Sequence, residues 1–191
     1  MTRRAIKRAL TDTLCDTPLN KISVTYIAGL CNINRNTFYI HYSSIEEAVR
    51  DIESDLKKYV LGELRKFTLQ EFLISPKLFT SAVSAALLNN ESKEKLLFRS
   101  TVSEMLLSQL SRDLVDYLVL LYQREIETPD PCCCYSFEFL VSGFIHSLVH
   151  WYHSDRSVRL EQCLERMNAL VEHGVGETFL IALKQSKIKI R

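Results

Sequence analysis

The chain contains 191 residues, enough to bury a hydrophobic core as one ordinary domain or as two small ones. Its composition, 47% hydrophobic and 25% charged, is that of a water-soluble globular protein, and no apolar run reaches the roughly 18 residues that a membrane-spanning helix requires. Residues 1–4 lead into an amphipathic segment rather than into an apolar signal sequence. We therefore expect a cytoplasmic protein with no membrane partner.

The formal net charge of +1 is unevenly distributed along the chain. Residues 1–42 hold six basic side chains and two acidic ones, a net charge of +4, which leaves −3 for the remaining 149 residues. A basic end on an otherwise acidic protein is typical of a module that meets phosphate groups. An ordinary asymmetry of solvated charges gives the same pattern. The charge alone therefore does not predict nucleic-acid binding, and the motif within this segment is needed to do so.

Apolar residues recur at intervals of three and four along almost the whole chain, and strand-like alternation is nearly absent. Glycine and proline, which interrupt helices, number only five and four. Both observations predict an all-α fold. In chain order, helices are expected at about residues 3–14, 24–31, 35–42, 45–67, 76–89, 92–98, 101–125, 132–153 and 158–173, followed by a basic segment at 184–191.

Polar side chains mark the beginnings of the short helices near the N-terminus. Ser23 and Asn34 are typical N-cap residues for the second and third helices. Asn32 lies in the turn between them, where asparagine tolerates a left-handed backbone. Ser44 and Glu47 have the spacing of a capping box and predict the start of the fourth helix.

The second and third helices, joined by a tight turn, have the form of a helix-turn-helix, whose second helix can enter the major groove of DNA. Phe38 and Tyr42 lie four residues apart and therefore share one face of the third helix. The residues expected to face inward and hold the two helices together are Ile27, Ala28, Cys31, Ile33, Phe38 and Tyr42. The outward face then presents basic, aromatic and hydrogen-bonding groups within about one turn of helix.

The outward residues carry groups that DNA-binding proteins use. Arg35 can pair bidentately with guanine, and Asn36 can do so with adenine. Thr37 and Ile40 can offer methyl groups to a thymine methyl. Thr25, Tyr39 and His41 can donate hydrogen bonds to phosphate oxygens, and Lys21 and Arg4 are also expected to bind DNA. Any amphipathic helix exposes polar residues, and it is their concentration on one turn that favours DNA binding over plain solvated surface.

Three segments of this region follow a known family pattern: they are Ile22-Ser23-Val24, Ile27-Ala28 and Thr37-Phe38-Tyr39-Ile40-His41. Together with the first helix and the start of the fourth, the sequence over about residues 3–55 resembles the DNA-binding domain of the TetR/AcrR transcriptional regulators. Two positions depart from the family pattern. Asn32 stands where the family has glycine, and Ile45 replaces a lysine, so that one phosphate contact is expected to be missing.

The resemblance implies an N-terminal three-helix helix-turn-helix domain at residues 1–46 and a C-terminal helical domain at residues 47–191 for effector binding and dimerisation. The implied function is a ligand-responsive transcriptional regulator, usually a repressor, that binds a palindromic operator in double-stranded DNA as a homodimer. It implies no enzymatic activity, and no cofactor or metal is expected. The small-molecule effector would change the separation of the two recognition helices, with the fourth helix as the lever.

The homodimer is expected to form through residues 132–173, which resemble the last two helices of many family members. The helix at 132–153 is apolar nearly all round, which requires burial on several sides. The apolar residues that carry this expectation are Phe137, Leu140, Val141, Phe144, Ile145 and Leu148. The alternative is that this helix is the central helix of a monomeric core.

An effector chamber is expected among the helices of about residues 60–153. Its candidate lining residues are Phe79, Phe98, Met105, Tyr117, Tyr122, Tyr135 and His146. Aromatic and methionine residues at helical spacing also form plain hydrophobic cores, so the pattern alone does not separate lining from core.

Cysteine and histidine residues in the same half leave a second kind of regulator open. Cys132-Cys133-Cys134 begins a helix, where a thiol pKa can fall, and such a cluster could sense thiol chemistry or oxidation. His146, His150 and His153 share a helix face and could bind a metal ion together with Cys163 or Cys134. Alternatively, the cysteines are reduced in the cytoplasm and pack as small apolar side chains, and the histidines lie in an interface. A small Cys/His enzyme or a helical interaction protein that does not bind DNA are further alternatives.

Overall fold

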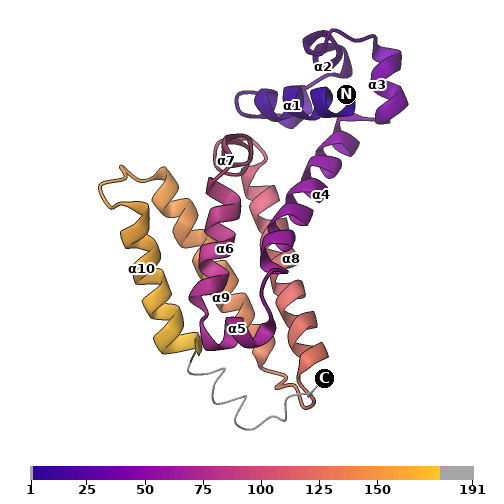
Figure 1. The fold of residues 1–191 in the computed structure, drawn as a ribbon. Coiled ribbons are helices and arrows are strands. Elements are labelled where there is room, and N and C mark those ends of the chain that lie inside the picture. Colours follow the sequence, from indigo (N-terminus) through magenta and orange to yellow (C-terminus); the bar gives the residue numbers. More distant parts are fainter. Residues whose placement is uncertain (1, 177–191) are drawn as a thin grey trace. The chain divides into compact units, whose positions relative to one another are not determined.

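Every element assigned in the part of the chain that the computed structural model describes, residues 2–176, is helical (Figure 1). This confirms the predicted all-α fold. The N-terminal elements are α1 (Thr2–Leu14), a short 3-10 helix (Leu19–Lys21), α2 (Val24–Leu30), α3 (Arg35–His41) and α4 (Ile45–Leu64). The later elements are α5 (Leu69–Ile74), α6 (Lys77–Leu88), α7 (Glu91–Phe98), α8 (Ser103–Glu125), α9 (Cys133–His153), α10 (Leu160–Leu170) and a π-helical segment (Val171–Gly176). The basic segment expected at residues 184–191 lies outside the described residues.

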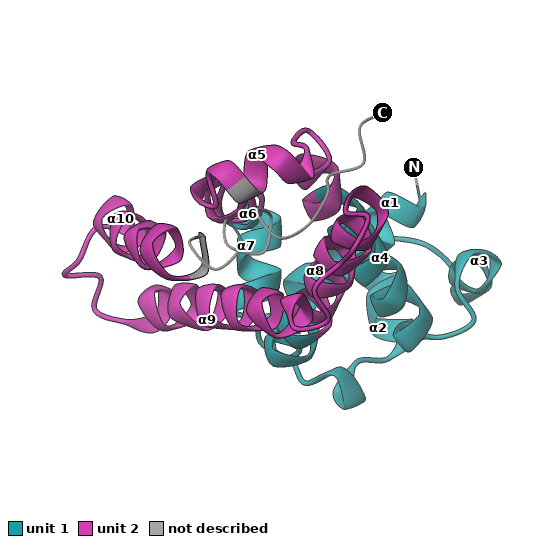
Figure 2. Ribbon diagram, turned by 90° about the horizontal axis from the view of Figure 1, so that it is seen from below, with its two compact units in different colours: residues 1–59, 87–108 teal, residues 60–86, 109–191 magenta. Residues whose placement is uncertain are grey.

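The chain divides into two compact units, which Figure 2 shows in different colours. Unit 1 consists of residues 1–59 and 87–108, and unit 2 consists of residues 60–86 and 109–191. The borders fall inside α4, α6 and α8, so each of these helices contributes residues to both units. None of the helices within residues 2–176 combines the length and the apolar character that crossing a membrane demands.

Helix α1 provides the central apolar stripe of unit 1. Ile6, Leu10 and Leu14 recur every four residues and are fully buried, which stabilises the unit by roughly 2 kcal/mol for each side chain. The helix packs against α2 and α7. Thr101 extends this packing, because its backbone N–H donates to the Leu14 carbonyl (2.8 Å) and its hydroxyl donates to the Thr17 carbonyl (3.1 Å). The end of α1 is therefore joined to the connection between α7 and α8.

The predicted caps of the helix-turn-helix are present. The Ser23 hydroxyl accepts a hydrogen bond from the Tyr26 N–H (3.2 Å), and the Asn34 side chain accepts one from the Asn36 N–H (2.9 Å). Asn32 adopts a left-handed backbone with φ of 52°, as expected for asparagine at a position where the family has glycine. These contacts satisfy helix N–H groups that would otherwise lack partners and turn the chain sharply between α2 and α3.

The start of α4 differs in detail from the capping box that the sequence predicts. The Ser44 hydroxyl accepts from the Glu47 N–H (3.2 Å), as expected. The Glu47 carboxylate, however, accepts from both the N–H and the hydroxyl of Ser43 (2.5 Å each) rather than from Ser44. The reciprocal half of the motif is therefore displaced by one residue towards the N-terminus.

Helix α5 was not expected, because the sequence pattern predicts that α4 continues to about residue 67. In the structure α4 ends at Leu64, and a complete capping box begins the next helix. The Glu71 N–H donates to the Thr68 hydroxyl (3.2 Å), and the Thr68 N–H donates to the Glu71 carboxylate (2.7 Å). The Thr-x-x-Glu spacing is the sequence signal that identifies this helix start.

A series of aromatic contacts forms the interior of unit 2. Phe67, Phe72, Phe79 and Phe144 follow one another with ring-centroid distances of 5.6, 6.2 and 6.5 Å. Tilted and edge-to-face pairs at these separations add to the free energy gained from burial. The six apolar residues of α9 that the sequence suggested for a dimer surface are all buried within the single chain: Phe137, Leu140, Val141, Phe144, Ile145 and Leu148. They form part of this interior.

Candidate nucleic-acid interface

Helices α2 and α3 are held together by the apolar residues that the sequence predicts. Ile27 and Phe38 are fully buried, and Ala28 and Tyr42 are each 2% exposed. The Phe38 ring lies between the rings of its helix neighbours, with centroid distances of 5.9 Å to both Tyr39 and Tyr42. Because α3 has only seven residues, which are too few for a stable isolated helix, this packing fixes its position.

The outer surface of α3 exposes most of the side chains predicted to contact DNA. Ile40 is 78% exposed and Tyr39 is 46% exposed. The predicted residues that are exposed are Thr25, Arg35, Asn36, Tyr39 and Ile40, with Lys21 and Arg4 outside the two helices, whereas Thr37 and His41 are half-buried. Two exposed residues of α2 also lie in the motif, Tyr26 and Leu30, each 54% exposed. Leu30 was not predicted to contact DNA, because its side chain has no hydrogen-bonding group.

The segment that carries this surface has a positive net charge. Residues 17–45, which contain α2 and α3, include Lys21 and Arg35 and no acidic residue. The Arg35 guanidinium lies 3.5 Å from the Tyr39 hydroxyl, one turn further along α3, at the limit of a hydrogen bond. An approaching phosphate therefore meets donors and cations on these helices without repulsion from a carboxylate on either of them.

A cluster of charged and phenolic side chains ties α1 and the end of α3 to α4, and we call Arg3, Lys7, Tyr42 and Asp51 the Asp51 clamp. The Arg3 guanidinium lies 2.8 Å from one Asp51 carboxylate oxygen, and Lys7 pairs with the other. The Tyr42 hydroxyl donates to Asp51 (2.6 Å) and accepts from Arg3 (3.1 Å). Lys7 also lies 2.5 Å from the Asp55 carboxylate. Two of the six cations in the basic N-terminal segment are thus paired with carboxylates of α4 rather than directed at phosphates.

The clamp shifts the pKa values of Asp51 and Tyr42. Burial opposes ionisation of Asp51, but hydrogen bonds from Lys7, Tyr42 and Arg3 outweigh it and lower the pKa of the carboxyl to about 2. Burial, and then the hydrogen bond to Asp51, raise the pKa of Tyr42 to about 12. At neutral pH the carboxylate is therefore ionised and the phenol keeps its proton, so the hydrogen bond between them is maintained.

The first turn of α4 carries negative rather than positive side chains. Ile45 is only 5% exposed and packs into the core of unit 1, at the position where the family has lysine. Glu46 and Glu47 follow it, and hydrogen bonds from Ser43 lower the pKa of the Glu47 carboxyl. Two ionised carboxylates at this helix start do not favour a phosphate, in keeping with the contact that the sequence leads us to expect to be missing.

The candidate effector residues lie in different surroundings. Phe98, Tyr122 and Phe79 are no more than 2% exposed and belong to the interiors of their units. Met105 and Tyr135, in contrast, are 47% and 71% exposed. Of the candidate residues, Tyr117 and His146 each line a hollow, and the two hollows are different ones.

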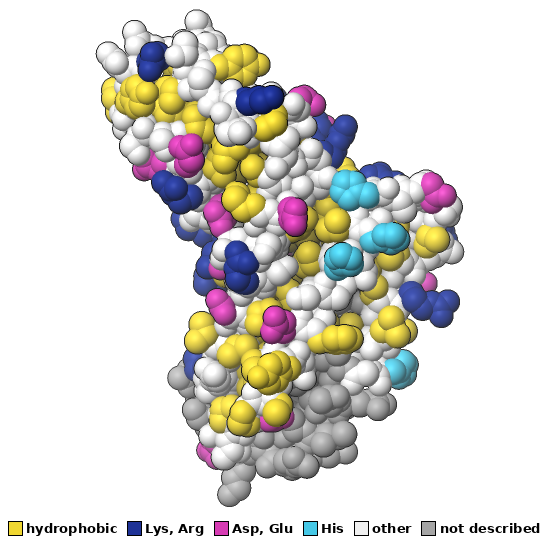
Figure 3. Space-filling view, turned by 180° about the vertical axis from the view of Figure 1, so that it is seen from behind, with side chains coloured by type: hydrophobic (Ala, Val, Ile, Leu, Met, Phe, Trp, Pro, Cys, Tyr) yellow, Lys and Arg dark blue, Asp and Glu magenta, His cyan; other side chains and the backbone are white. Residues whose placement is uncertain are grey.

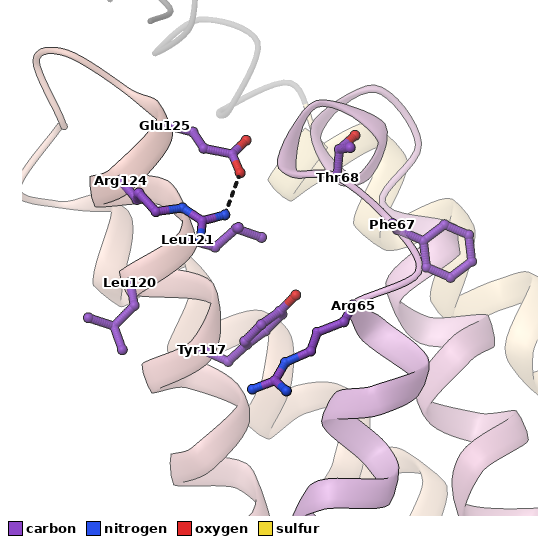
Figure 4. A pocket seen from close by; sticks show the side chains of 8 residues that line it. All are labelled: Arg65, Phe67, Thr68, Tyr117, Leu120, Leu121, Arg124 and Glu125. Atoms are coloured by element: carbon purple, nitrogen blue, oxygen red, sulfur yellow. Dashed lines mark hydrogen bonds and ion pairs between the residues drawn. The ribbon is translucent and has the colours of Figure 1, made fainter. Parts of the chain in front are cut away.

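Tyr117 lines an open hollow of about 700 Å³ in unit 2, between the connection that follows α4 and the end of α8 (Figure 4). Figure 4 shows the Arg65 guanidinium beside the Tyr117 ring. Arg124 pairs with Glu125 at the same hollow (3.1 Å). Burial raises the pKa of Tyr117, so its hydroxyl stays protonated at neutral pH. The hollow thus combines apolar side chains with the Tyr117 phenol, the Arg65 guanidinium and the paired charges of Arg124 and Glu125.

Histidine side chains gather on one face of unit 2 (Figure 3). His146, His150 and His153 are exposed on α9, and the first two line a hollow of about 810 Å³ together with Cys163. Within residues 2–176, however, no three or more His, Cys, Asp or Glu side chains are grouped so that they could hold a metal ion. Burial raises the pKa of Cys133 to about 11 and also raises that of Cys163, which keeps both thiols protonated and unreactive at neutral pH.

Comparison with solved structures identifies a similar protein. The crystal structure of a TetR transcriptional regulator from Streptococcus agalactiae 2603V matches this chain with a TM-score of 0.59 and 26% sequence identity. The alignment covers 89% of this chain and 93% of that one, so the similarity extends well beyond the helix-turn-helix. No family model matches the sequence, and no curated protein matches it.

We expect Asp51→Asn to lower the free energy of unfolding at neutral pH by about 1 kcal/mol, after allowance for solvent screening at the exposed Arg3. The pKa of Asp51 is lower in the folded chain, so its contribution is present above the ordinary carboxyl value of 3.8 and is lost as the pH falls towards 2. The difference from wild type should therefore shrink below about pH 4, as measured by urea denaturation at a series of pH values. Glu53→Gln, on the same helix but outside the clamp, is the control. A difference that does not change with pH would contradict this assignment.

Proposed function

We infer, from the motif at residues 22–42 and from a structural match over 89% of the chain, that this protein belongs to the TetR family of transcriptional regulators and is a DNA-binding transcriptional regulator. We further propose that it is a repressor that binds a palindromic operator as a homodimer and releases it when a small molecule binds. The observation that carries the DNA-binding proposal is α3, which exposes hydrogen-bonding side chains above a fully buried Phe38 and in a segment without carboxylates.

In this proposal residues 1–46 form the DNA-binding domain and residues 47–191 form the effector-binding and dimerisation domain. Arg35 and Asn36 at the N-terminal end of α3 read base edges, as recognition helices do with their first residues. Tyr39 and Thr25 contact phosphates and set the position of the helix on the duplex. The Asp51 clamp supports this arrangement because it ties the C-terminal end of α3, through Tyr42, to α1 and α4.

Tyr39→Ala should weaken binding to DNA from the upstream region of the protein's own gene about tenfold, because a positioning contact on the exposed face of α3 is lost. Fluorescence anisotropy across a salt series measures this, and wild-type binding should strengthen as the salt concentration falls. Ile74→Ala removes an exposed apolar side chain from α5 (67% exposed), outside both α3 and the proposed dimer interface, and should bind as wild type does. Equal, weak binding by all three proteins would refute DNA recognition by α3.

The homodimer is proposed to form through residues 132–173. Because the apolar core residues of α9 are buried within the chain, the partner must contact the other face. That face exposes Tyr135 and Phe139 (71% and 75%) on α9, and Leu170 (70%) is exposed on α10. Large exposed apolar side chains on neighbouring helices are typical of a protein–protein interface. They support a dimer in which α9 and α10 of the two copies pack together.

Phe139→Glu should convert the dimer into a monomer, because a buried and unpaired carboxylate at the centre of the interface costs several kcal/mol. Sedimentation equilibrium measures the change. Leu120→Glu places the same charge at a 65% exposed leucine of α8, outside the proposed interface, and should remain dimeric. A wild-type protein that is monomeric at all accessible concentrations would exclude the dimer.

The effector is proposed to be a small organic acid that binds the hollow at Arg65 and Tyr117. The apolar side chains there can cover a hydrocarbon body, while the guanidinium and the phenol can bind its carboxylate. Helix α4 contributes residues up to Tyr59 to unit 1 and continues from Val60 into unit 2. It is therefore the element through which a bound effector would change the separation of the recognition helices.

Naphthalene-2-carboxylate, a fluorescent aromatic acid, serves as a probe of this hollow. We expect it to bind the wild-type protein and to bind Arg65→Ala at least fivefold more weakly, because the guanidinium that receives the carboxylate is removed. Fluorescence titration gives both affinities. Lys66→Ala removes an adjacent exposed cation and should have no effect. Equal binding by wild type and Arg65→Ala would locate the probe elsewhere.

A further inference from the structure

A third hollow, of about 590 Å³, lies within unit 1 between α1, α4 and α7. Its lining includes five basic side chains and three acidic ones. The basic side chains come from two facing walls: Arg4, Lys7 and Arg8 from α1, and Lys93 and Lys95 from α7. Of this set, Arg4 is a candidate DNA contact and Lys7 belongs to the Asp51 clamp, whereas the effector proposal uses none of it.

Pairing inside the hollow leaves a surplus of positive charge. Lys7 is held by Asp55 (2.5 Å) and Lys95 is held by Glu91 (2.7 Å). Among the described residues, Arg4, Arg8 and Lys93 form no ion pair with any carboxylate. Asp12 is the third carboxylate of the lining and is the one left to offset these three cations.

The three unpaired cations are placed so that a single ligand could contact all of them. Arg4 and Arg8 lie one helical turn apart on the same face of α1, where like charges destabilise a helix. Lys93 faces them from the opposite wall. The floor contains Ile52 and Leu56, which are 7% and 4% exposed, and an apolar floor strengthens electrostatic attraction above it. An anion with several charges would relieve the repulsion between the walls.

The walls are held by contacts that do not involve a ligand. Thr101 bonds to the end of α1, as described above, and the Asn90 side chain accepts a hydrogen bond from the Lys93 N–H (3.1 Å) at the start of α7. The Lys93 ammonium lies 3.7 Å from the centre of the Tyr59 ring, and this cation–π contact restrains it. Little ordering of these elements is therefore needed on binding, which favours affinity.

We propose that this hollow binds a small anion with a diphosphate group, such as inorganic pyrophosphate or a nucleoside diphosphate. Guanidinium groups bind phosphate oxygens bidentately, and two of them on one wall match two linked phosphates better than a single carboxylate. The volume suits a ligand of nucleotide size. Binding itself does not depend on the proposed function. Because Arg4 is also a candidate phosphate contact in DNA, occupancy of the hollow would lower DNA affinity, and this second effect rests on that function.

Isothermal titration of the full chain with inorganic pyrophosphate, at low salt and without DNA, tests the proposal. Pyrophosphate should bind with one site per chain and at least tenfold more tightly than orthophosphate. The double variant Arg8→Ala/Lys93→Ala should lose at least tenfold in affinity, because it removes one unpaired cation from each wall. Arg50→Ala/Lys58→Ala removes two exposed cations of α4 that are outside the lining and should bind as wild type does. Thermal unfolding confirms that both variants are folded.

Titrations with ADP and with the two double variants distinguish a specific diphosphate site from non-specific attraction and from a role in DNA binding. Tighter binding of ADP than of pyrophosphate assigns the hollow to a nucleoside diphosphate, and equal binding assigns it to the diphosphate group alone; both support the proposal. Equal weakening by the two double variants would show non-specific attraction and overturn it. Loss of DNA affinity in Arg8→Ala/Lys93→Ala, with no pyrophosphate binding by wild type, would also overturn it and assign the cations to DNA. The Tyr39→Ala measurement does not depend on any of these outcomes.

Discussion

The carboxylate of Asp51 is the point at which three helices of unit 1 meet. Its side chain is only 17% exposed, and an unpaired charge at such a position would be costly. Arg3 and Lys7 of α1 and the hydroxyl of Tyr42 at the end of α3 satisfy it together. Without these partners α3 would be held mainly by the burial of Phe38, and a seven-residue helix would have more freedom to turn. The orientation of the surface proposed to read DNA therefore depends on one carboxylate, which is ionised and paired with two cations and which is not itself proposed to contact DNA.

Most helices could be predicted because their signals are local. The four-residue repeat of α1 and the caps at Ser23 and Asn34 involve residues within one or two turns of each other. Helix α5 was missed because its six residues are too few to show a periodicity, and its Thr68–Glu71 capping box was the only local signal. The last long helix was predicted to continue to about residue 173, but it ends at Leu170 and a π-helical segment follows. An apolar pattern does not distinguish these two hydrogen-bonding schemes.

The candidate sites could be predicted only in part, because a sequence pattern gives the face of a side chain and not its partner. The outward position of Tyr39 and Ile40 follows from the helical repeat alone. The pairing of Lys7 with Asp55, 48 residues away, does not follow from any repeat, and neither does the burial of Ile45. The same limit explains why the effector residues could not be told apart from core residues in the sequence. Tyr122 is buried in the core and Tyr117 lines a hollow, but both show the same helical spacing.

The basic residues of the N-terminal segment divide into three groups once their partners are known. Arg3 and Lys7 are engaged by carboxylates of α4 and stabilise the unit. Arg4 and Arg8 line the hollow between α1 and α7. Lys21 and Arg35 lie in the segment without acidic residues that contains the helix-turn-helix. A net charge of +4 in the sequence therefore does not represent four phosphate contacts. Because Lys7 belongs to the clamp and also lines the hollow, an anion in the hollow would act on the same helix that the clamp holds in place. Through that shared helix, the proposed anion would influence the orientation of α3.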